Sequence, residues 1–209
     1  MMGLEAVYTV RSNQPRGAGV LEMSTGVRFT VSDLALLPED SNRYEIIDGD
    51  LHVSTQPHWR HQFTCDQLIG ALRDWGRPTA VGIPISAPGL IFAEDQAVAP
   101  DIVWISRERF ARVIGKDGKL HAAPDLVIEV LSPGQSSVER DRELKLRLYS
   151  RQGVREYWIA DWREPAVQVY RRDGAVLQLA ATLLAEDTLT SPLLPGFARR
   201  VGDLCQSPI

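Results

Sequence analysis

The hydrophobic and polar residues of this chain follow two periods, one typical of helices and one typical of strands. A first long helix is predicted at 59–75 and a second at 137–152, and Gly153 ends the second. In the first helix, the apolar residues that recur at helical spacing are Phe63, Leu68, Ile69, Leu72 and Trp75. Both segments are long enough for helices that pack on a sheet.

Runs rich in β-branched and aromatic residues predict strands around these helices. Segment 43–54 holds Asp48 and Gly49 between two such runs, which is a strong β-hairpin signal. Further strands are predicted at 79–86, 97–105 and 124–131, and later at VREYWIAD, VQVYRR and LQLAATLLA. Between them, 106–122 is predicted to be a loop, and a Pro-rich tail follows the last strand.

The order helix, three strands, helix, strand predicts an α/β (α+β) fold with one crossover and a mixed central sheet flanked by helices. Residues 1–26 show no sustained period and are predicted to be a poorly ordered tail. The remaining residues, 27–205, are predicted to form one domain. A chain of 209 residues with 44% hydrophobic and 24% charged content is consistent with that size.

Targeting signals and cysteine chemistry are not evident in the sequence. The chain has no apolar run of about 18 residues and no basic region followed by an apolar one at its start, so neither a membrane span nor a signal peptide is predicted. We therefore expect a cytoplasmic protein without a membrane partner. Cys65 and Cys205 lie far apart without metal-ligand spacing, and are predicted to be core or surface thiols.

The net charge of −4 is unevenly distributed along the chain. Residues 1–105 carry 13 acids and 7 bases, a net of −6, whereas residues 106–209 carry 14 acids and 16 bases, a net of +2. The basic side chains concentrated around the second helix are Arg140, Arg142, Lys145, Arg147, Arg151 and Arg155. This group could face the phosphates of a nucleic acid, or it could be a solvated helix face.

Two acidic residues lie inside predicted apolar strands, Asp101 in AVAPDIVWIS and Glu129 in PDLVIEVLS. Two carboxylates that converge among Val, Ile and Leu usually recover their lost hydration from a cation. Oxygen ligands favour Mg²⁺, with Mn²⁺ as its substitute. Asp125 shares a strand face with Glu129 but lies roughly 13 Å away at about 3.3 Å per residue, so both cannot bind one ion. Asp125 is predicted to be a turn or capping residue.

Lys145 lies on the apolar face of the second predicted helix. At helical spacing it shares a stripe with Val138, Asp141, Leu148 and Gln152, and this stripe should face the sheet. A lysine beside two metal-binding carboxylates is a minimal set for metal-assisted hydrolysis of a phosphodiester. The alternative is a lysine whose stem packs on the sheet while its ammonium group reaches solvent.

The chain resembles the Uma-two family of endonucleases, within the PD-(D/E)XK restriction-endonuclease-like superfamily. The resemblance runs from about Arg28 to Leu204. The motifs that carry it are YEIIDGDLHVS, His61, PDIVWIS, PDLVIEVLSP, RDRELKLRLY, GVREYWIAD and LTSPLLPGF. It implies a restriction-endonuclease-like αβββαβ core with an N-terminal β-hairpin and a C-terminal β extension.

The resemblance also implies roles for individual residues. It implies that Asp101 is the first-motif aspartate and that Glu129 is the acidic member of the second motif. The superfamily's usual lysine falls two residues after the glutamate, where this chain has Leu131. In similar families the lysine comes from the following helix, and Lys145 matches that displaced position. Glu45 matches an additional acid near the first helix.

His61 also matches a family position, although a histidine at a helix start is more often structural than catalytic. Tyr149, Tyr157 and Trp158 match as well, and core packing is expected for them. The candidate nucleic-acid contacts are Arg140, Arg142, Arg147 and His61.

The implied function is that of a Mg²⁺-dependent endonuclease acting on nucleic acid, with DNA as the expected substrate. The catalytic candidates are Glu45, Asp101, Glu129 and Lys145, and the three acids are also the metal-ligand candidates. A homodimer is an open option. The competing hypothesis is a non-catalytic module that keeps the fold to bind nucleic acid or protein, and a weaker one is a hydrolase of another phosphate ester.

Overall fold

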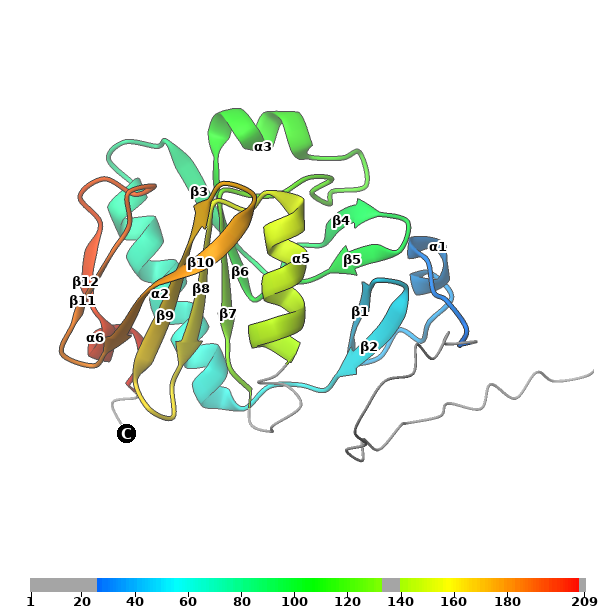
Figure 1. Ribbon diagram of the computed structural model, residues 1–209, viewed down its shortest axis with the longest axis horizontal. Helices are drawn as coiled ribbons and strands as arrows, with labels where there is room; N and C mark the ends of the chain where they lie inside the picture. The colour runs from blue at the N-terminus through cyan, green and yellow to red at the C-terminus, as the bar shows by residue number, and fades with distance from the viewer. Residues whose placement is uncertain (1–25, 133–139, 207–209) are drawn as a thin grey trace, which may run out of the picture.

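A six-stranded mixed sheet forms the centre of the fold (Figure 1). The structure is a computed structural model that describes residues 26–132 and 140–206. The strand order is β10 (Val176–Leu184), β9 (Ala166–Asp173), β8 (Glu156–Asp161), β7 (Leu126–Val130), β6 (Ile102–Ser106) and β3 (Gly82–Ser86). Strands β7 and β8 are parallel and their other neighbours are antiparallel. The connection between β7 and β8 is therefore the one crossover in this sheet.

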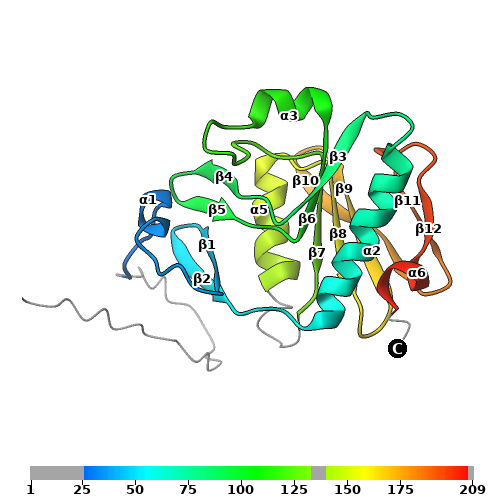
Figure 2. The same cartoon turned by 180° about the vertical axis from the view of Figure 1, so that it is seen from behind.

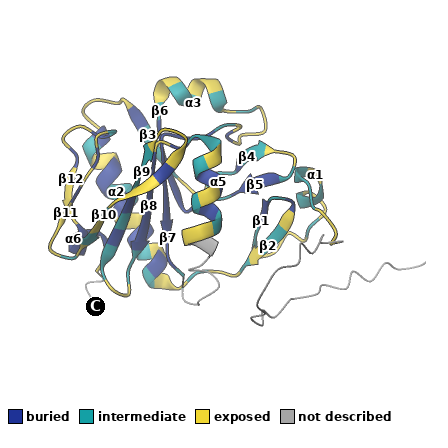
Figure 3. Cartoon of the chain, viewed as in Figure 1, coloured by how far each residue is buried: buried dark blue, intermediate teal, exposed yellow. Residues whose placement is uncertain are grey.

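One helix covers each face of the central strands, α2 (Trp59–Gly76) on one side and α5 (Lys145–Gln152) on the other (Figures 1 and 2). Strand alternation divides β6 between the two cores. Ile102 and Trp104 belong to the core under α2, and Val103 and Ile105 belong to the core under α5. With both faces covered, β6, β7 and β8 are buried along most of their length (Figure 3).

A second, four-stranded antiparallel sheet lies beside α5 (Figure 1). Its order is β2 (Asp50–Ser54), β1 (Arg43–Ile47), β5 (Gln96–Val98) and β4 (Leu90–Ala93). The predicted hairpin is confirmed, because β1 and β2 pair across Asp48 and Gly49. These two residues have φ of 51° and 75°, as a two-residue turn with both central residues left-handed requires. A single helical turn, α1 (Val31–Leu34), precedes the hairpin.

The predicted core order is confirmed, since α2, β3, β6, β7, α5 and β8 follow one another as αβββαβ with the second sheet's β4 and β5 inserted. Strands β9 and β10 form the C-terminal β extension. The predicted strand 97–105 is instead two strands in different sheets, β5 and β6. Pro100 lies in the break between them and has no N–H for a ladder, so the chain leaves one sheet and enters the other there.

Two segments predicted to be irregular contain regular structure. The loop prediction for 106–122 is wrong at its start, because α3 (Arg107–Val113) follows β6 directly; seven residues are too few for a clear period. The tail contains β11 (Thr188–Thr190), β12 (Ala198–Arg200) and α6 (Val201–Cys205). The apolar side chains of α6 join the core under α2, so this helix gains its stability from packing.

The second long helix begins with a π-helical turn, η1 (Arg140–Leu144), and continues as α5 (Lys145–Gln152). Gly153 follows α5 as its C-cap, with a φ of 84°. The predicted start of this helix at 137–139 and most of the predicted tail at 1–26 lie outside the described residues. Within the part of the chain that is described, no helix is both long and apolar enough to cross a membrane.

Candidate active site

Asp101, the residue just before β6, and Glu129 on β7 face each other across these two adjacent antiparallel strands. The pairs Ile102–Ile128 and Val103–Val127 set the register, and one more step places Asp101 opposite Glu129. Directly opposite residues on such strands have Cβ atoms about 5 Å apart. Both side chains are buried, with exposed fractions of 6% and 2%. The two acids predicted from separate strands therefore lie next to each other.

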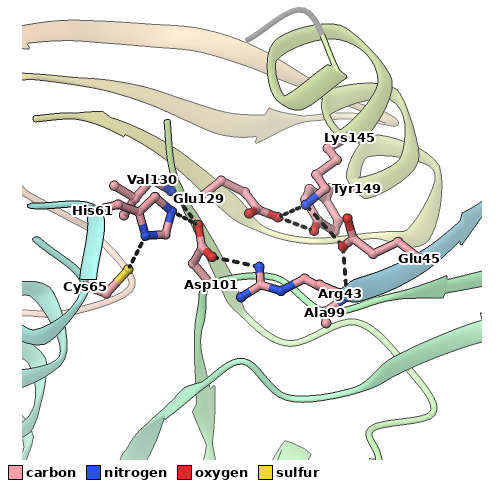
Figure 4. A network of polar contacts seen from close by, with 10 residues as sticks. All are labelled: Arg43, Glu45, His61, Cys65, Ala99, Asp101, Glu129, Val130, Lys145 and Tyr149. Carbon is pink, nitrogen blue, oxygen red and sulfur yellow. Dashed lines mark hydrogen bonds and ion pairs between the residues drawn. The ribbon is translucent and has the colours of Figure 1, made fainter. Parts of the chain in front are cut away.

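Asp101 is held by three partners from three parts of the chain (Figure 4). Its Oδ1 accepts a hydrogen bond from Arg43 Nη1 at 2.8 Å. Its Oδ2 accepts from the backbone N–H of Val130 at 2.9 Å and lies 3.1 Å from His61 Nε2. Arg43 comes from β1 and His61 from the first turn of α2, so Asp101 links the second sheet to α2.

Lys145 joins two further carboxylates on the α5 side of the sheet. Its Nζ lies 2.8 Å from Glu129 Oε1 and 3.2 Å from Glu45 Oε1. The Tyr149 hydroxyl donates to the same Glu129 oxygen at 2.8 Å, and the backbone N–H of Ala99 donates to Glu45 Oε1 at 2.9 Å. Lys145 is 1% exposed, so its ammonium group points into the fold, as the helical stripe predicted. The alternative of a solvated ammonium group is excluded.

Electrostatics keep Asp101 charged despite its burial. Burial of Asp101 opposes its ionisation, but the hydrogen bond with His61 and the positive charge of Arg43 outweigh it, so the pKa of Asp101 lies well below its usual range. Burial also lowers the pKa of Arg43, yet the charge of Asp101 more than compensates and raises it. Burial and the charge of Glu129 raise the pKa of Tyr149 well above its usual value, so its hydroxyl remains a donor.

Asp101 and Glu129 line the floor of a groove of about 990 Å³. One wall is the hairpin and the segment that leads from β2 to α2, and the other wall is the start of α5. Among the residues that line it are Arg43, Asp101, Glu129 and Lys145. The groove therefore reaches Asp101, Glu129 and Lys145, which are buried, and Arg43, whose side chain is partly exposed.

The four predicted nucleic-acid contacts lie in different environments. Arg147 is exposed and lines the groove, and it pairs loosely with Glu143 at 3.9 Å. Arg142 is exposed but is not among the groove residues. His61 is 3% exposed and is bonded to Asp101 at the groove floor. The side chain of Arg140 lies outside the described residues.

The donor set suits a hard divalent cation, because the carboxylates supply oxygen ligands. Among the described residues, the one group of three or more metal-ligating side chains whose ligand atoms all lie within 4.8 Å is His61, Cys65 and Asp101. In that group Cys65 Sγ contacts His61 Nδ1 at 3.7 Å, whereas Asp101 contacts the opposite ring nitrogen. Burial raises the pKa of the Cys65 thiol, and sulfur is a soft ligand that suits a hard cation such as Mg²⁺ poorly. Asp101 and Glu129, opposite each other on the groove floor, are the better pair.

Sequence reasoning missed Arg43 and the contact of Cys65, and it gave Tyr149 only a packing role. Tyr149 does pack in the core, but its hydroxyl also bonds Glu129. Its spacing of four residues from Lys145 was a usable signal, because both then lie on one helix face. Arg43 and Glu45 likewise alternate onto one face of β1. Asp125 lies at the opposite end of the sheet, where its carboxylate accepts from the Ser106 N–H at 2.9 Å; this confirms its separation from Glu129.

Comparisons with known proteins agree with this geometry. The model of the Uma2 family, described as "Putative restriction endonuclease", matches residues 31–202. A crystal structure described as "a putative nuclease belonging to DUF820", from Anabaena variabilis ATCC 29413, is similar to this chain with a TM-score of 0.68 and 21% sequence identity. The similarity covers 84% of this chain and 97% of the other, and it supports the restriction-endonuclease-like fold. No curated protein matches.

Proposed function

Because the chain belongs to the Uma2 family, whose description supports nuclease function in general terms, we propose that it is a divalent-metal-dependent endonuclease that hydrolyses phosphodiester bonds in nucleic acid, with DNA as the expected substrate. The observation that carries the proposal is that Asp101, Glu129 and Lys145 line one groove, with Glu45 behind them in an ion pair with Lys145. Isolated buried acids stabilise folds, but acids that open onto a groove can meet a substrate.

In this proposal Asp101 and Glu129 hold Mg²⁺, and Glu45 supports it directly or through water. The ion, when bound, would polarise the phosphate and lower the pKa of a water molecule. Lys145 orients the attacking water or stabilises the charge that develops on the phosphate. His61 orients Asp101, because its ring nitrogen contacts one carboxylate oxygen within a buried environment.

Arg147 and Arg142 are proposed to bind the substrate backbone. Arg147 supplies positive charge to the α5 wall of the groove, and Arg142, exposed on η1 but outside the groove lining, would contact a backbone that extends beyond the groove. Such contacts hold phosphates without reading sequence, and they weaken as salt rises.

One observation favours the non-catalytic alternative. Arg43 and Lys145 already neutralise much of the charge of the three carboxylates, as a binding module without a metal would require. Such a module would use the groove and its basic residues to hold nucleic acid or protein without cleaving anything. Metal dependence of cleavage separates the two hypotheses.

The test is a titration of Mg²⁺ and Mn²⁺ against single-stranded DNA, double-stranded DNA and RNA, with a chelator control. Glu129→Gln is the matched variant, because it removes the charge and keeps the shape. We expect metal-dependent cleavage by the native protein and none by Glu129→Gln, with circular dichroism showing both folded. Cleavage that survives in Glu129→Gln would place the chemistry elsewhere, and no cleavage by either protein would favour the binding module.

A further inference from the structure

Arg43 is the cation that reaches the acids from the groove side. It projects from β1 on the same face as Glu45, and its Nη1 lies 2.8 Å from Asp101 Oδ1 (Figure 4). Its side chain is 30% exposed and lines the groove, whereas that of Lys145 is 2% exposed. The two cations of the site therefore differ in their access to solvent.

The charge balance of the site restricts what can be added to it. In the network drawn in Figure 4, Glu45, Asp101 and Glu129 carry three negative charges, against the two permanent positive charges of Arg43 and Lys145. A divalent cation added to this arrangement would leave an excess of positive charge in a buried site, which is costly. Binding is favourable if one protein cation leaves at the same time.

Arg43 is the cation that can leave. Its guanidinium contacts Asp101 Oδ1, its side chain is partly exposed and the groove lies beside it, whereas Lys145 is buried and pairs with Glu45 and Glu129. A released guanidinium would stay tethered to β1 at the rim of the groove. There its planar set of donors suits a phosphate group better than a lysine would.

We propose that Arg43 is an exchangeable counter-ion: it occupies Asp101 when the site holds no metal, and it turns into the groove to bind a substrate phosphate when a divalent cation takes the carboxylate. This inference rests on the proposed function, because it needs a divalent cation at Asp101. It adds a coupling between metal binding and substrate binding through one side chain.

The first test measures metal binding without nucleic acid. Mn²⁺ affinity is determined by titration calorimetry for the native protein, Arg43→Met and Arg147→Met. Removing the competing charge at Asp101 should tighten Mn²⁺ binding by about tenfold or more in Arg43→Met. Arg147→Met removes a charge from the same groove, but that side chain is 72% exposed and screened, so its Mn²⁺ affinity should match the native value.

Thermal unfolding gives a second readout that does not need activity. Without metal, Arg43→Met should melt at a lower temperature, because Asp101 loses its ion-pair partner in a buried position. Added Mn²⁺ should then raise its melting temperature more than that of the native protein. If Arg43→Met does not fold, Arg43→Lys keeps the charge and should retain near-native Mn²⁺ affinity.

Substrate binding should change in the opposite direction to metal binding when Arg43 is replaced. At saturating Mn²⁺, KM for a short oligonucleotide should rise in both Arg43→Met and Arg43→Lys, and its salt dependence should fall in Arg43→Met by about one phosphate contact. Tighter Mn²⁺ binding together with weaker substrate binding in Arg43→Met is a result that an arginine with a purely structural role would not give.

The failures are distinguishable. A native protein that binds no Mn²⁺ overturns the proposed function, and this inference with it. A native protein that binds Mn²⁺ as tightly as Arg43→Met overturns the counter-ion role alone. An unchanged KM in both Arg43 variants overturns the phosphate role.

Discussion

The two ends of the β6–β7 pair both hold buried acids with cationic partners, but they differ in charge balance and in access. At one end Asp125, 2% exposed, pairs with Arg109 at 3.3 Å and Arg155 at 3.2 Å. Two cations and a backbone N–H serve one carboxylate there. At the other end, among the described residues, Arg43 and Lys145 form ion pairs with three carboxylates, two of which line a groove.

This difference separates a structural acid from a functional one. Both kinds of acid lie in apolar strands, and both form ion pairs, so neither burial nor pairing identifies a functional site. At the groove end a divalent cation can replace Arg43, which has the groove beside it, whereas Asp125 lies in a site where two arginines already balance one carboxylate. The comparison therefore predicts that substitutions at the groove end change activity and that substitutions at the Asp125 end change stability alone.

The largest effect is expected for Lys145→Met at the groove end. Turnover should fall by roughly 10²- to 10⁴-fold, because a water-orienting or charge-stabilising group is lost, while nucleic-acid affinity changes little. Stability should also fall, by about 3–5 kcal/mol, since Glu45 and Glu129 lose a buried partner. Turnover is therefore measured by single-turnover assays on protein shown to be folded.

Arginine variants on the same helix are the control for Lys145. Arg142→Met and Arg147→Met should weaken binding and flatten its salt dependence, with less effect on turnover at saturation. If Lys145→Met behaves like them, Lys145 contacts phosphate or only supports the fold. Leu131 would then mark a lost catalytic lysine, and the binding module would become the better account.

An intermediate effect is expected for Asp125→Asn at the opposite end. The variant keeps the shape but loses two charge-assisted contacts, so the free energy of unfolding should fall by about 1–3 kcal/mol. The arginines are part exposed, which limits the cost of leaving them unpaired. Urea unfolding measures this change, and turnover of the folded variant should equal that of the native protein. A large loss of turnover in folded Asp125→Asn would contradict the prediction that substitutions at this end change stability alone.

The sequence predicted those site residues whose environment follows from local pattern. Asp101 and Glu129 stood out as acids among strand residues, and the helical stripe placed Lys145 against the sheet before any contact was known. The structure brings Glu129 and Lys145 within 2.8 Å, which agrees with that pattern. Glu45 came from the family resemblance alone.

The residues that the sequence did not predict depend on contacts between distant segments. Arg43 meets Asp101 across 58 positions, and the meeting requires the chain to change sheets at Pro100. The same change divided the predicted strand 97–105. Strand periodicity indicates which face of a sheet a residue occupies, but not which sheet it belongs to or which residue it contacts. The contact between Arg43 and Asp101 and the division of 97–105 therefore could not be predicted from local spacing.

The smallest expected effect is the pH dependence of stability. It should have opposite directions at the groove end, where Asp101 lies, and at the Asp125 end, where Glu156 lies. Burial opposes ionisation of Asp101, but its hydrogen bond with His61 and the charge of Arg43 hold the pKa of Asp101 below its usual range. Its contribution to stability is therefore present above the unfolded pKa of about 3.9 and is lost as the pH falls through the folded value. Glu156, which pairs with Leu126 at the Asp125 end, has its pKa raised by burial, against hydrogen bonds from Trp158 and Ser191.

A raised carboxyl pKa acts in the opposite direction, because the stability gained from protonated Glu156 is present at low pH and is lost as the pH rises through the folded value. Urea unfolding in the presence of a chelator, at steps from pH 3 to pH 8, therefore separates the two ends. The destabilisation caused by Asp101→Asn should shrink as the pH falls below about 4. Glu156→Gln, which stays neutral, should gain stability relative to the native protein as the pH rises above about 4.3. If the free energies of unfolding of the two variants, relative to the native protein, change with pH in the same direction, the folded state does not shift the pKa values of Asp101 and Glu156 in opposite directions.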